Sequence, residues 1–218
     1  MGVKYSLVVF DWDGTLLDSA ATIVRSIQAA CHDLGLPIPD DARARHVIGL
    51  GLADAMRHAV PELRPEQMQA MVDRYRHHYL SSDHQLTLFA GVPAMLERLR
   101  SAGHMLAIAT GKSRIGLERA LDHSGLRPVF MGSRCADECH SKPHPQMLEE
   151  LILEFGVDAA STVMIGDTSH DMQMARNAGV DGLAVTYGAH PHAHLLDSSP
   201  RACLHSVQEL DAWLAQNA

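Results

Sequence analysis

LVVFDWDGT, residues 7–15, is the most informative stretch of the sequence. Its first four residues form a continuous apolar run, which is typical of a strand that a parallel sheet buries on both faces. The run stops at Asp11, and Asp13 and Gly14 follow in a polar turn. We therefore predict the first strand of a parallel sheet at Leu7 to Phe10, with two carboxylates just beyond its carboxyl end.

The pattern changes twice after this stretch. From residue 19 to residue 86, apolar side chains recur at the three- and four-residue spacing of helices, and prolines separate the helical stretches. From residue 87 onward, short apolar runs alternate with helical stretches. Further strands are expected at Met105 to Ala109, Val129 to Met131, Thr162 to Ile165 and Gly182 to Thr186.

This alternation predicts an α/β fold, a doubly wound parallel sheet with a Rossmann-like core. The helical residues that interrupt it predict a small all-helical cap domain. We expect the core to comprise residues 1–18 and 87–218, and the cap to comprise residues 19–86. A chain of 218 residues is long enough for one core domain that carries such an insertion.

Composition excludes several classes of function. The 18 Lys and Arg residues against 26 Asp and Glu residues give a net charge of −8, so the chain lacks the basic surface of a nucleic-acid binder. No stretch has the length and apolarity of a membrane helix, so we expect no membrane partner. The four cysteines form no disulfide pattern, which favours the reducing cytoplasm.

Polar residues follow the predicted strands at the points where the strands end. They are Asp11, Asp13, Thr110, Asp167 and Asp171, with Lys142 in a loop between two of the strands. In an open parallel sheet the carboxyl ends of the strands face one crevice, where ligands bind. Four carboxylates in one crevice repel each other unless a cation lies among them, and an all-oxygen set suits Mg²⁺. A lysine and a threonine hydroxyl would then hold the remaining oxygens of a phosphate ester.

The order of these residues resembles the four signature motifs of the haloacid dehalogenase superfamily. The motifs are DWDGT at residues 11–15, the strand-end Thr110, Lys142 in KPHP, and GDTSHD at residues 166–171. The helical insertion directly after the first motif resembles the cap of the subgroup that includes phosphoglycolate phosphatases. The resemblance spans the chain and implies phosphoryl-transfer chemistry.

The resemblance also implies a role for each motif residue. Asp11 would attack phosphorus and form an aspartyl-phosphate, and Asp13 would act as general acid and then as general base. Thr110, Gly111 and Lys142 would hold the transferred phosphoryl group. The cofactor would be Mg²⁺. Its ligands would be the Asp11 carboxylate, the Asp13 main-chain carbonyl and Asp167, with Asp171 as a further ligand or as a partner behind the ligands.

Other polar residues have plainer interpretations. We expect Lys112 to face solvent, because Lys142 fits the phosphate position better. The segment from Cys135 to His140 is expected to be structural, since no partner pair lies at zinc spacing. The histidines of His190-Pro-His192-Ala-His194 are expected in a solvated loop rather than at a metal.

Two features of the predicted cap have alternative interpretations. Residues 48–52 (IGLGL) suit either a mobile loop that reaches the active site or a simple turn between helices. Met68, Met71 and Tyr75 recur at helical spacing and favour the core of the cap over contact with substrate.

The function that these patterns favour is a Mg²⁺-dependent phosphatase. Its substrate would be phosphoglycolate or a similar small phosphorylated metabolite, and the enzyme would be a monomer or a homodimer. The alternatives are a sugar-phosphate mutase that transfers the phosphoryl group, and a non-enzymatic interaction protein on the same scaffold. The segment after Asp18 lacks the histidine found in the mutase relatives, which places a mutase second.

Overall fold

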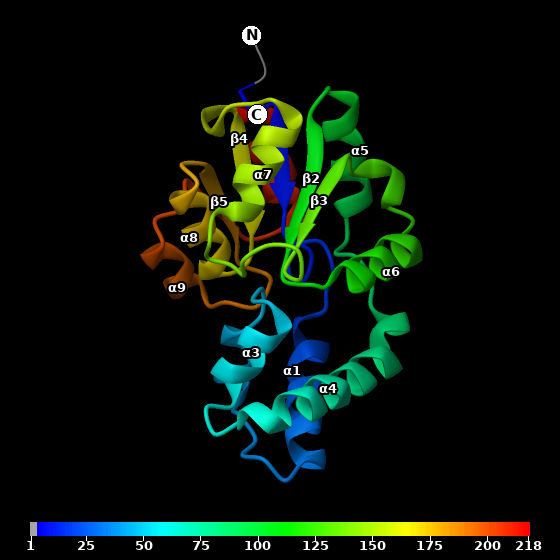
Figure 1. The fold of residues 1–218 in the computed structure, drawn as a ribbon. Helices are drawn as coiled ribbons and strands as arrows, with labels where there is room; N and C mark the ends of the chain where they lie inside the picture. Colours follow the sequence, from blue (N-terminus) through cyan, green and yellow to red (C-terminus); the bar gives the residue numbers. More distant parts are fainter. Residues whose placement is uncertain (1–3) are drawn as a thin grey trace.

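The computed structural model describes residues 4–218, and in this range six parallel strands form one sheet (Figure 1). The order across the sheet is β3-β2-β1-β4-β5-β6. The strands are β1 (Leu7–Phe10), β2 (Met105–Thr110), β3 (Gly132–Cys135), β4 (Thr162–Gly166), β5 (Asp181–Val185) and β6 (Ala202–Leu204). This order confirms the predicted doubly wound fold. From β1 the chain builds the sheet toward β2 and β3 on one side, and then continues with β4, β5 and β6 on the other side. Such sheets bind their ligands at this switch point between β1 and β4.

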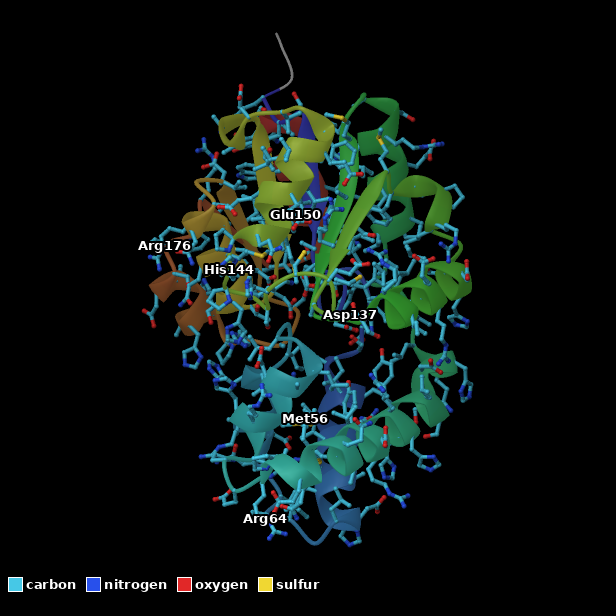
Figure 2. All side chains as sticks on the ribbon, viewed as in Figure 1. Met56, Arg64, Asp137, His144, Glu150 and Arg176 are labelled. Atoms are coloured by element: carbon cyan, nitrogen blue, oxygen red, sulfur yellow. The ribbon has the colours of Figure 1, made fainter. Side chains whose placement is uncertain are left out.

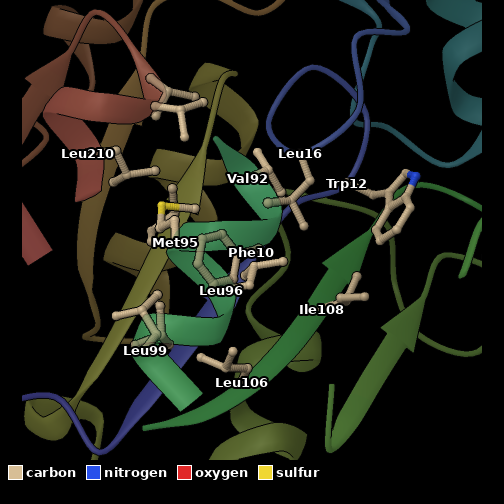
Figure 3. Packing of buried hydrophobic residues seen from close by; sticks show 14 of the residues in the cluster. Phe10, Trp12, Leu16, Val92, Met95, Leu96, Leu99, Leu106, Ile108 and Leu210 are labelled. Carbon is tan, nitrogen blue, oxygen red and sulfur yellow. The ribbon is translucent and has the colours of Figure 1, made fainter. Parts of the chain in front are cut away.

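Helices cover both faces of this sheet. They are α5 (Val92–Ser101), α6 (Arg114–Ser124), α7 (Gln146–Phe155), α8 (Ser169–Asn177), α9 (His192–Asp197) and α10 (Val207–Asn217). Val8 and Phe10 of β1 pack in one cluster with α5, α6 and α10, and Leu7 and Val9 pack in another with α7 and α8. Successive side chains of a strand point to opposite faces, so the apolar run of β1 serves both clusters. Figure 3 shows Phe10 packed beside Met95 and Leu96 of α5.

Four helices form the cap beyond the carboxyl ends of the strands (Figure 1). They are α1 (Ala20–Asp33), α2 (Asp41–His46), α3 (Leu52–Ala59) and α4 (Met68–Ser82). Ile27, Met56 and Met71 lie at the centre of a separate apolar cluster within them. The short 3-10 turns of the described chain are Pro65–Gln67, Asp83–Gln85, Arg127–Val129 and Ala159–Ser161. The division at residues 18/19 and 86/87 stays a prediction.

The two segments that join core and cap lie side by side. The Phe89 N–H donates to the Leu16 carbonyl, and the Asp18 N–H donates to the Thr87 carbonyl, each at 3.0 Å. Both connections therefore leave the core close to the end of β1, which places the cap directly over Asp11 and Asp13.

The strand predicted near Val129 to Met131 exists but lies a few residues further along the chain. Residues Arg127–Val129 form a 3-10 turn with Pro128 near its start, and the strand begins at Gly132. β3 lies at the edge of the sheet and has the sequence GSRC, so it carries no apolar run that could reveal it. β6, α9 and α10 follow the last predicted strand and were not predicted. Within residues 4–218, no helix has the length and apolar character needed to cross a membrane.

Candidate active site

Asp11 lies buried at the end of β1. Its N–H donates to the Ile165 carbonyl at 2.9 Å, which continues the pairing of β1 with β4 past the end of the strand. Its Oδ1 lies 2.8 Å from Lys142 Nζ, and within residues 4–218 its buried Oδ2 has no hydrogen-bond partner. Burial raises the pKa of Asp11 to about 7, although the charge of Lys142 opposes the rise. An unpartnered carboxylate oxygen in a buried site is suited to bind a cation or to react with a substrate.

Lys142 joins two carboxylates. Its Nζ lies 2.8 Å from Asp11 Oδ1 and 2.7 Å from Asp171 Oδ1, and all three side chains are buried. Burial alone would lower the pKa of Lys142, but the two carboxylates raise it above its usual value. Lys142 therefore stays charged beside the candidate nucleophile, as its predicted role requires.

Asp171 also closes the amino end of α8. Its Oδ2 accepts from the Thr168 hydroxyl at 2.6 Å and from the Thr168 N–H at 3.1 Å, a reciprocal capping box. Its other oxygen contacts Lys142. Both oxygens of Asp171 thus have protein partners, so the side chain serves the helix start and the lysine together.

Asp167 lies at the end of β4, next to β1. Its Oδ1 accepts from the Thr15 hydroxyl at 2.8 Å, and its Oδ2 accepts from the Ala189 N–H at 2.7 Å. Burial raises the pKa of Asp167 well above its usual value, and the charge of Asp11 adds to the rise. These hydrogen bonds fix the side chain close to Asp11 without neutralising it.

Asp11, Asp167 and Asp171 form an acidic cluster that could hold a divalent metal, with Asp11 and Asp167 as the candidate direct ligands. One carboxylate oxygen from each lies within 4.8 Å of the others. Burial raises the pKa of Asp11 and of Asp167, so a cation is needed for these crowded carboxylates to be ionised together at neutral pH. Hard oxygen ligands in this number suit Mg²⁺, which completes its coordination with water or phosphate oxygens.

Glycines allow the close approach of backbone to the site. Gly14 has φ +80°, and a Cβ there would overlap the Asp167 carboxylate. A Cβ on Gly111 would lie 2.5 Å from the carbonyl oxygens of Gly49 and Leu50 in the cap. Thr110 precedes Gly111 at the end of β2, and its Oγ1 accepts from the Lys112 N–H at 3.2 Å.

Asp13 and Lys112 form an ion pair at the cap-facing side of the site. Asp13 Oδ1 accepts from the Ser19 hydroxyl at 2.7 Å, and Asp13 Oδ2 lies 3.0 Å from Lys112 Nζ. The predicted solvent exposure of Lys112 was wrong, because only 11% of its side chain is exposed. Its Nζ also donates to the Tyr79 hydroxyl at 3.0 Å, so α4 of the cap covers it. Burial by itself would lower the pKa of Lys112, but Asp13 together with Tyr79 and Tyr75 raises it above its usual value.

A cavity of about 1060 Å³ lies between core and cap. Asp11, Asp13 and Thr110 line it from the core, and the side chains that line it from the cap are mostly apolar. Asp137, labelled in Figure 2, lies on the core side where the cap begins. This cavity gives a substrate access to the candidate nucleophile and gives its leaving group a place in the cap.

Residues 48–52 connect α2 to α3, as the second interpretation had it, and they also reach the core, as the first one had it. Beside the close approach to Gly111, the Gly51 N–H donates to Ser141 Oγ at 2.8 Å. Met71 is buried in the cap core as predicted, and Met68 packs against it. Tyr75 packs on the same cluster but also lines the cavity, so the prediction that placed it in the core alone was incomplete.

The prediction of a solvated loop was wrong for His190, whereas His192 and His194 are exposed at the start of α9. His190 is 2% exposed, its Nδ1 accepts from the Ser169 N–H at 3.0 Å, and its Nε2 lies 3.1 Å from the His46 carbonyl. His170 Nε2 contacts the same carbonyl at 2.8 Å. The His46 carbonyl ends α2 of the cap, so two core histidines supply the hydrogen bonds that a helix end lacks. Sequence spacing gave no signal for this cluster, because its three histidines come from distant segments.

The segment from Cys135 to His140 matches its structural interpretation. Cys135 is buried at the end of β3, and its N–H donates to Glu138. The Arg114 guanidinium pairs with the same glutamate, which ties α6 to the segment. Each of the chain's four cysteines is a free thiol in the structure.

Residues 8–185 match the haloacid dehalogenase-like hydrolase family. The chain belongs to this family. It is 36% identical over 211 residues to the probable phosphatase IndB of Dickeya dadantii, covering 94% of this chain and 91% of that protein. It is 32% identical over 203 residues to the phosphoglycolate phosphatase of Aliivibrio fischeri, covering 89% of each.

Solved structures share this fold. The crystal structure of a predicted phosphoglycolate phosphatase from Haemophilus somnus superposes with a TM-score of 0.84 at 24% identity, covering 98% of this chain and 97% of that one. At this identity the likeness concerns the fold. Taken with the relatives, these findings place the chain in the phosphoglycolate phosphatase-like subgroup, as a phosphatase of the phosphoric monoester hydrolase class.

Proposed function

We propose that this phosphatase is Mg²⁺-dependent and hydrolyses phosphoglycolate or a similar small phosphomonoester through an aspartyl-phosphate. The observation that carries the proposal is the state of Asp11. It is buried, one of its oxygens is paired with Lys142, and the other has no partner in residues 4–218. That free oxygen belongs to the residue that must attack phosphorus.

The first half of the reaction transfers the phosphoryl group to Asp11. A carboxylate oxygen of Asp11 forms a bond to phosphorus while the ester P–O bond breaks. Asp13 gives its proton to the leaving alkoxide, and its place at the cap side of the site puts it next to that oxygen. The leaving group departs as an alcohol.

The second half releases phosphate. A water molecule attacks the aspartyl-phosphate, and Asp13 now takes the proton of that water. The P–O bond to Asp11 breaks, which restores the carboxylate and yields inorganic phosphate. Ser19 and Lys112 hold the two oxygens of the ionised Asp13, which is the state that accepts the proton of the water.

Phosphate positioning falls to Thr110, Gly111 and Lys142. The Lys142 charge beside Asp11 offsets the negative charge of the transferred group. The Thr110 hydroxyl and the Gly111 N–H lie at the end of β2, beside β1, and supply neutral donors. In-line transfer depends mainly on such positioning and charge neutralisation.

Mg²⁺ would be held by the Asp11 carboxylate, the Asp13 main-chain carbonyl and Asp167. When bound, it supplies positive charge that lets the carboxylates and the phosphate share one site. We assign Asp171 to the support of this set, because its two oxygens already bind Lys142 and Thr168.

The substrate class rests on the relatives and on the cavity. The Aliivibrio fischeri relative is named for phosphoglycolate, which supports a small phosphorylated acid as substrate. The closed contact of residues 48–52 on Gly111 supports a cap that shields the reaction from water. A cytoplasmic location agrees with the four free thiols.

Hydrolysis of a generic aryl phosphate tests the proposal. Purified protein is expected to release free phosphate with Mg²⁺ and to stop in EDTA. Asp11→Asn is expected to abolish turnover, while Asp73→Asn, an exposed aspartate on α4, serves as the matched control. Turnover without metal, or an active Asp11→Asn variant, would refute the mechanism. Substrate loss without equal phosphate release would indicate a mutase instead.

A further inference from the structure

Lys112 is a buried cation that has no contact with the substrate in the proposed phosphoryl-transfer steps. The sequence contains three lysines, Lys4, Lys112 and Lys142, and arginines provide its remaining formal positive charge. Lys142 contacts the nucleophile, and Lys4 is 40% exposed, pairs with Asp181 and does not line the cavity. Lys112 instead lines the cavity between core and cap, with 11% of its side chain exposed.

The hydrogen bonds of Lys112 leave room for a further partner. An ammonium group has three protons to donate. Asp13 Oδ2 and the Tyr79 hydroxyl, each at 3.0 Å, account for two of them within residues 4–218. Tyr79 accepts from Lys112, so its own hydroxyl proton is available to another acceptor. Two donors therefore converge on the same part of the cavity.

The location of this pair identifies the part of the substrate it would meet. Asp13 protonates the oxygen of the leaving group, so a side chain in contact with Asp13 lies on the leaving-group side of phosphorus. Tyr79 belongs to α4, which covers that side from the cap. Tyr75 stacks on Tyr79 with 5.8 Å between ring centroids and holds its orientation. The donors are thus fixed from core and cap together.

We propose that Lys112 and Tyr79 bind an anionic group carried by the leaving group. The group is a carboxylate or a second phosphate, a few bonds from the ester oxygen. The inference rests on the proposed phosphatase function and narrows its substrates to phosphomonoesters with a second anion. A charge-assisted bond from a buried ammonium, supported by a phenol hydroxyl, discriminates strongly against a neutral group.

A matched pair of substrates tests this role. Phosphoglycolate and ethyl phosphate share the ester and differ in a carboxylate against a methyl group. We expect Lys112→Met to lower kcat/KM for phosphoglycolate about 10- to 100-fold more than for ethyl phosphate, mainly through KM. Tyr79→Phe is expected to act in the same direction with a smaller effect, and Lys112→Arg to restore part of the preference. Lys4→Met is the control and keeps the wild-type preference.

The outcomes separate the possible roles of Lys112. An equal loss of kcat on both substrates would overturn the proposal and leave Lys112 as a positioning residue for Asp13. Ethane-1,2-diol bisphosphate carries a phosphorylated methylene in place of the carboxylate, and a stronger effect of Lys112→Met on it would assign the site to a second phosphate. If Lys112→Met fails to fold, Tyr79→Phe keeps the ring packing and still shows whether the loss of activity depends on the second anion of the substrate. Failure of the wild-type enzyme on every ester would refute the phosphatase function, which is a different result.

Discussion

Lys142 and Asp171 form a fully buried ion pair, with 2.7 Å between Nζ and Oδ1. The pair links the loop before α7 to the first turn of α8, two segments that lie far apart in the chain. Because Asp171 is also fixed by its capping box with Thr168, it holds Lys142 in place beside Asp11. The charge that neutralises the nucleophile is therefore positioned by the start of a helix.

Removal of the Lys142 charge is expected to reduce both stability and activity. Lys142→Met leaves Asp11 and Asp171 buried without their cation, and breaking such a pair costs about 3–5 kcal/mol. Urea unfolding of the metal-free protein measures this loss. Lys4→Met removes an exposed lysine that pairs with Asp181 and should cost less than about 1 kcal/mol. Equal losses in the two variants would contradict the buried pair.

Asp11 is expected to give the metal-free protein an unusual pH dependence. Its pKa is raised to about 7 in the folded state, chiefly by burial, so the folded protein holds a proton there more tightly than the unfolded chain does. Its contribution to stability is therefore present at low pH and is lost as pH rises from about 4 to 7.

Unfolding curves of wild type and Asp11→Asn across this range measure the contribution of Asp11. The variant lacks the titrating group, so the difference in free energy of unfolding between the two proteins should change steadily with pH. Addition of Mg²⁺ should reduce the difference, because a bound cation stabilises the ionised carboxylate. A difference that stays constant with pH would show that Asp11 titrates normally.

The contribution of His190 to stability is expected to depend on pH in the opposite direction. Burial foremost, and then the charge of His170, lower its pKa to about 4, so the folded protein keeps this ring neutral. Its contribution to stability is complete above the unfolded value of 6.5 and is lost as pH falls toward 4. His190→Ala should therefore flatten the acid side of the stability profile.

His190→Ala should also lower stability at neutral pH. It leaves the Ser169 N–H without its acceptor and removes one of the two donors to the His46 carbonyl, at a cost of about 1–3 kcal/mol. His192→Ala, an exposed residue of the same tract, is the matched control. Identical melting profiles of the two variants would exclude the contact between His190 and the cap.

Local patterns sufficed to predict much of the fold. The apolar run of β1 is short and continuous because both faces of the strand are covered, and the same reason revealed β2 and β4. The place of β3 was predicted a few residues too early, because an edge strand with one arginine paired to α7 needs no apolar run to mark it. Strand ends that meet at one edge also brought Asp11, Asp167 and Asp171 together as expected.

The environments of Lys112 and His190 could not be predicted in this way. Each depends on how the cap rests on the core, since Tyr79 of α4 covers Lys112 and the end of α2 covers His190. Such contacts join residues from distant segments, and no spacing within one segment encodes them. The same holds for the approach of Gly49 and Leu50 to Gly111.

Gly111→Ala is expected to disturb the closed arrangement of cap and core. A Cβ at this position would lie 2.5 Å from two carbonyl oxygens of the cap, and backbone atoms cannot move aside as a flexible side chain can. The cap segment must shift, and a displacement of about 1 Å near a reacting group lowers kcat/KM by up to about a hundredfold. Steady-state kinetics on phosphoglycolate measure the loss.

Gly116→Ala is the matched control for this variant. Gly116 lies in α6, two residues into the helix, and the nearest atom to a new Cβ is the Ser113 hydroxyl at 3.3 Å, a side-chain atom. Activity of this control should stay close to wild type. If Gly111→Ala behaves in the same way, the active conformation does not require residues 49 and 50 against Gly111, and the cap must reach the site by another surface.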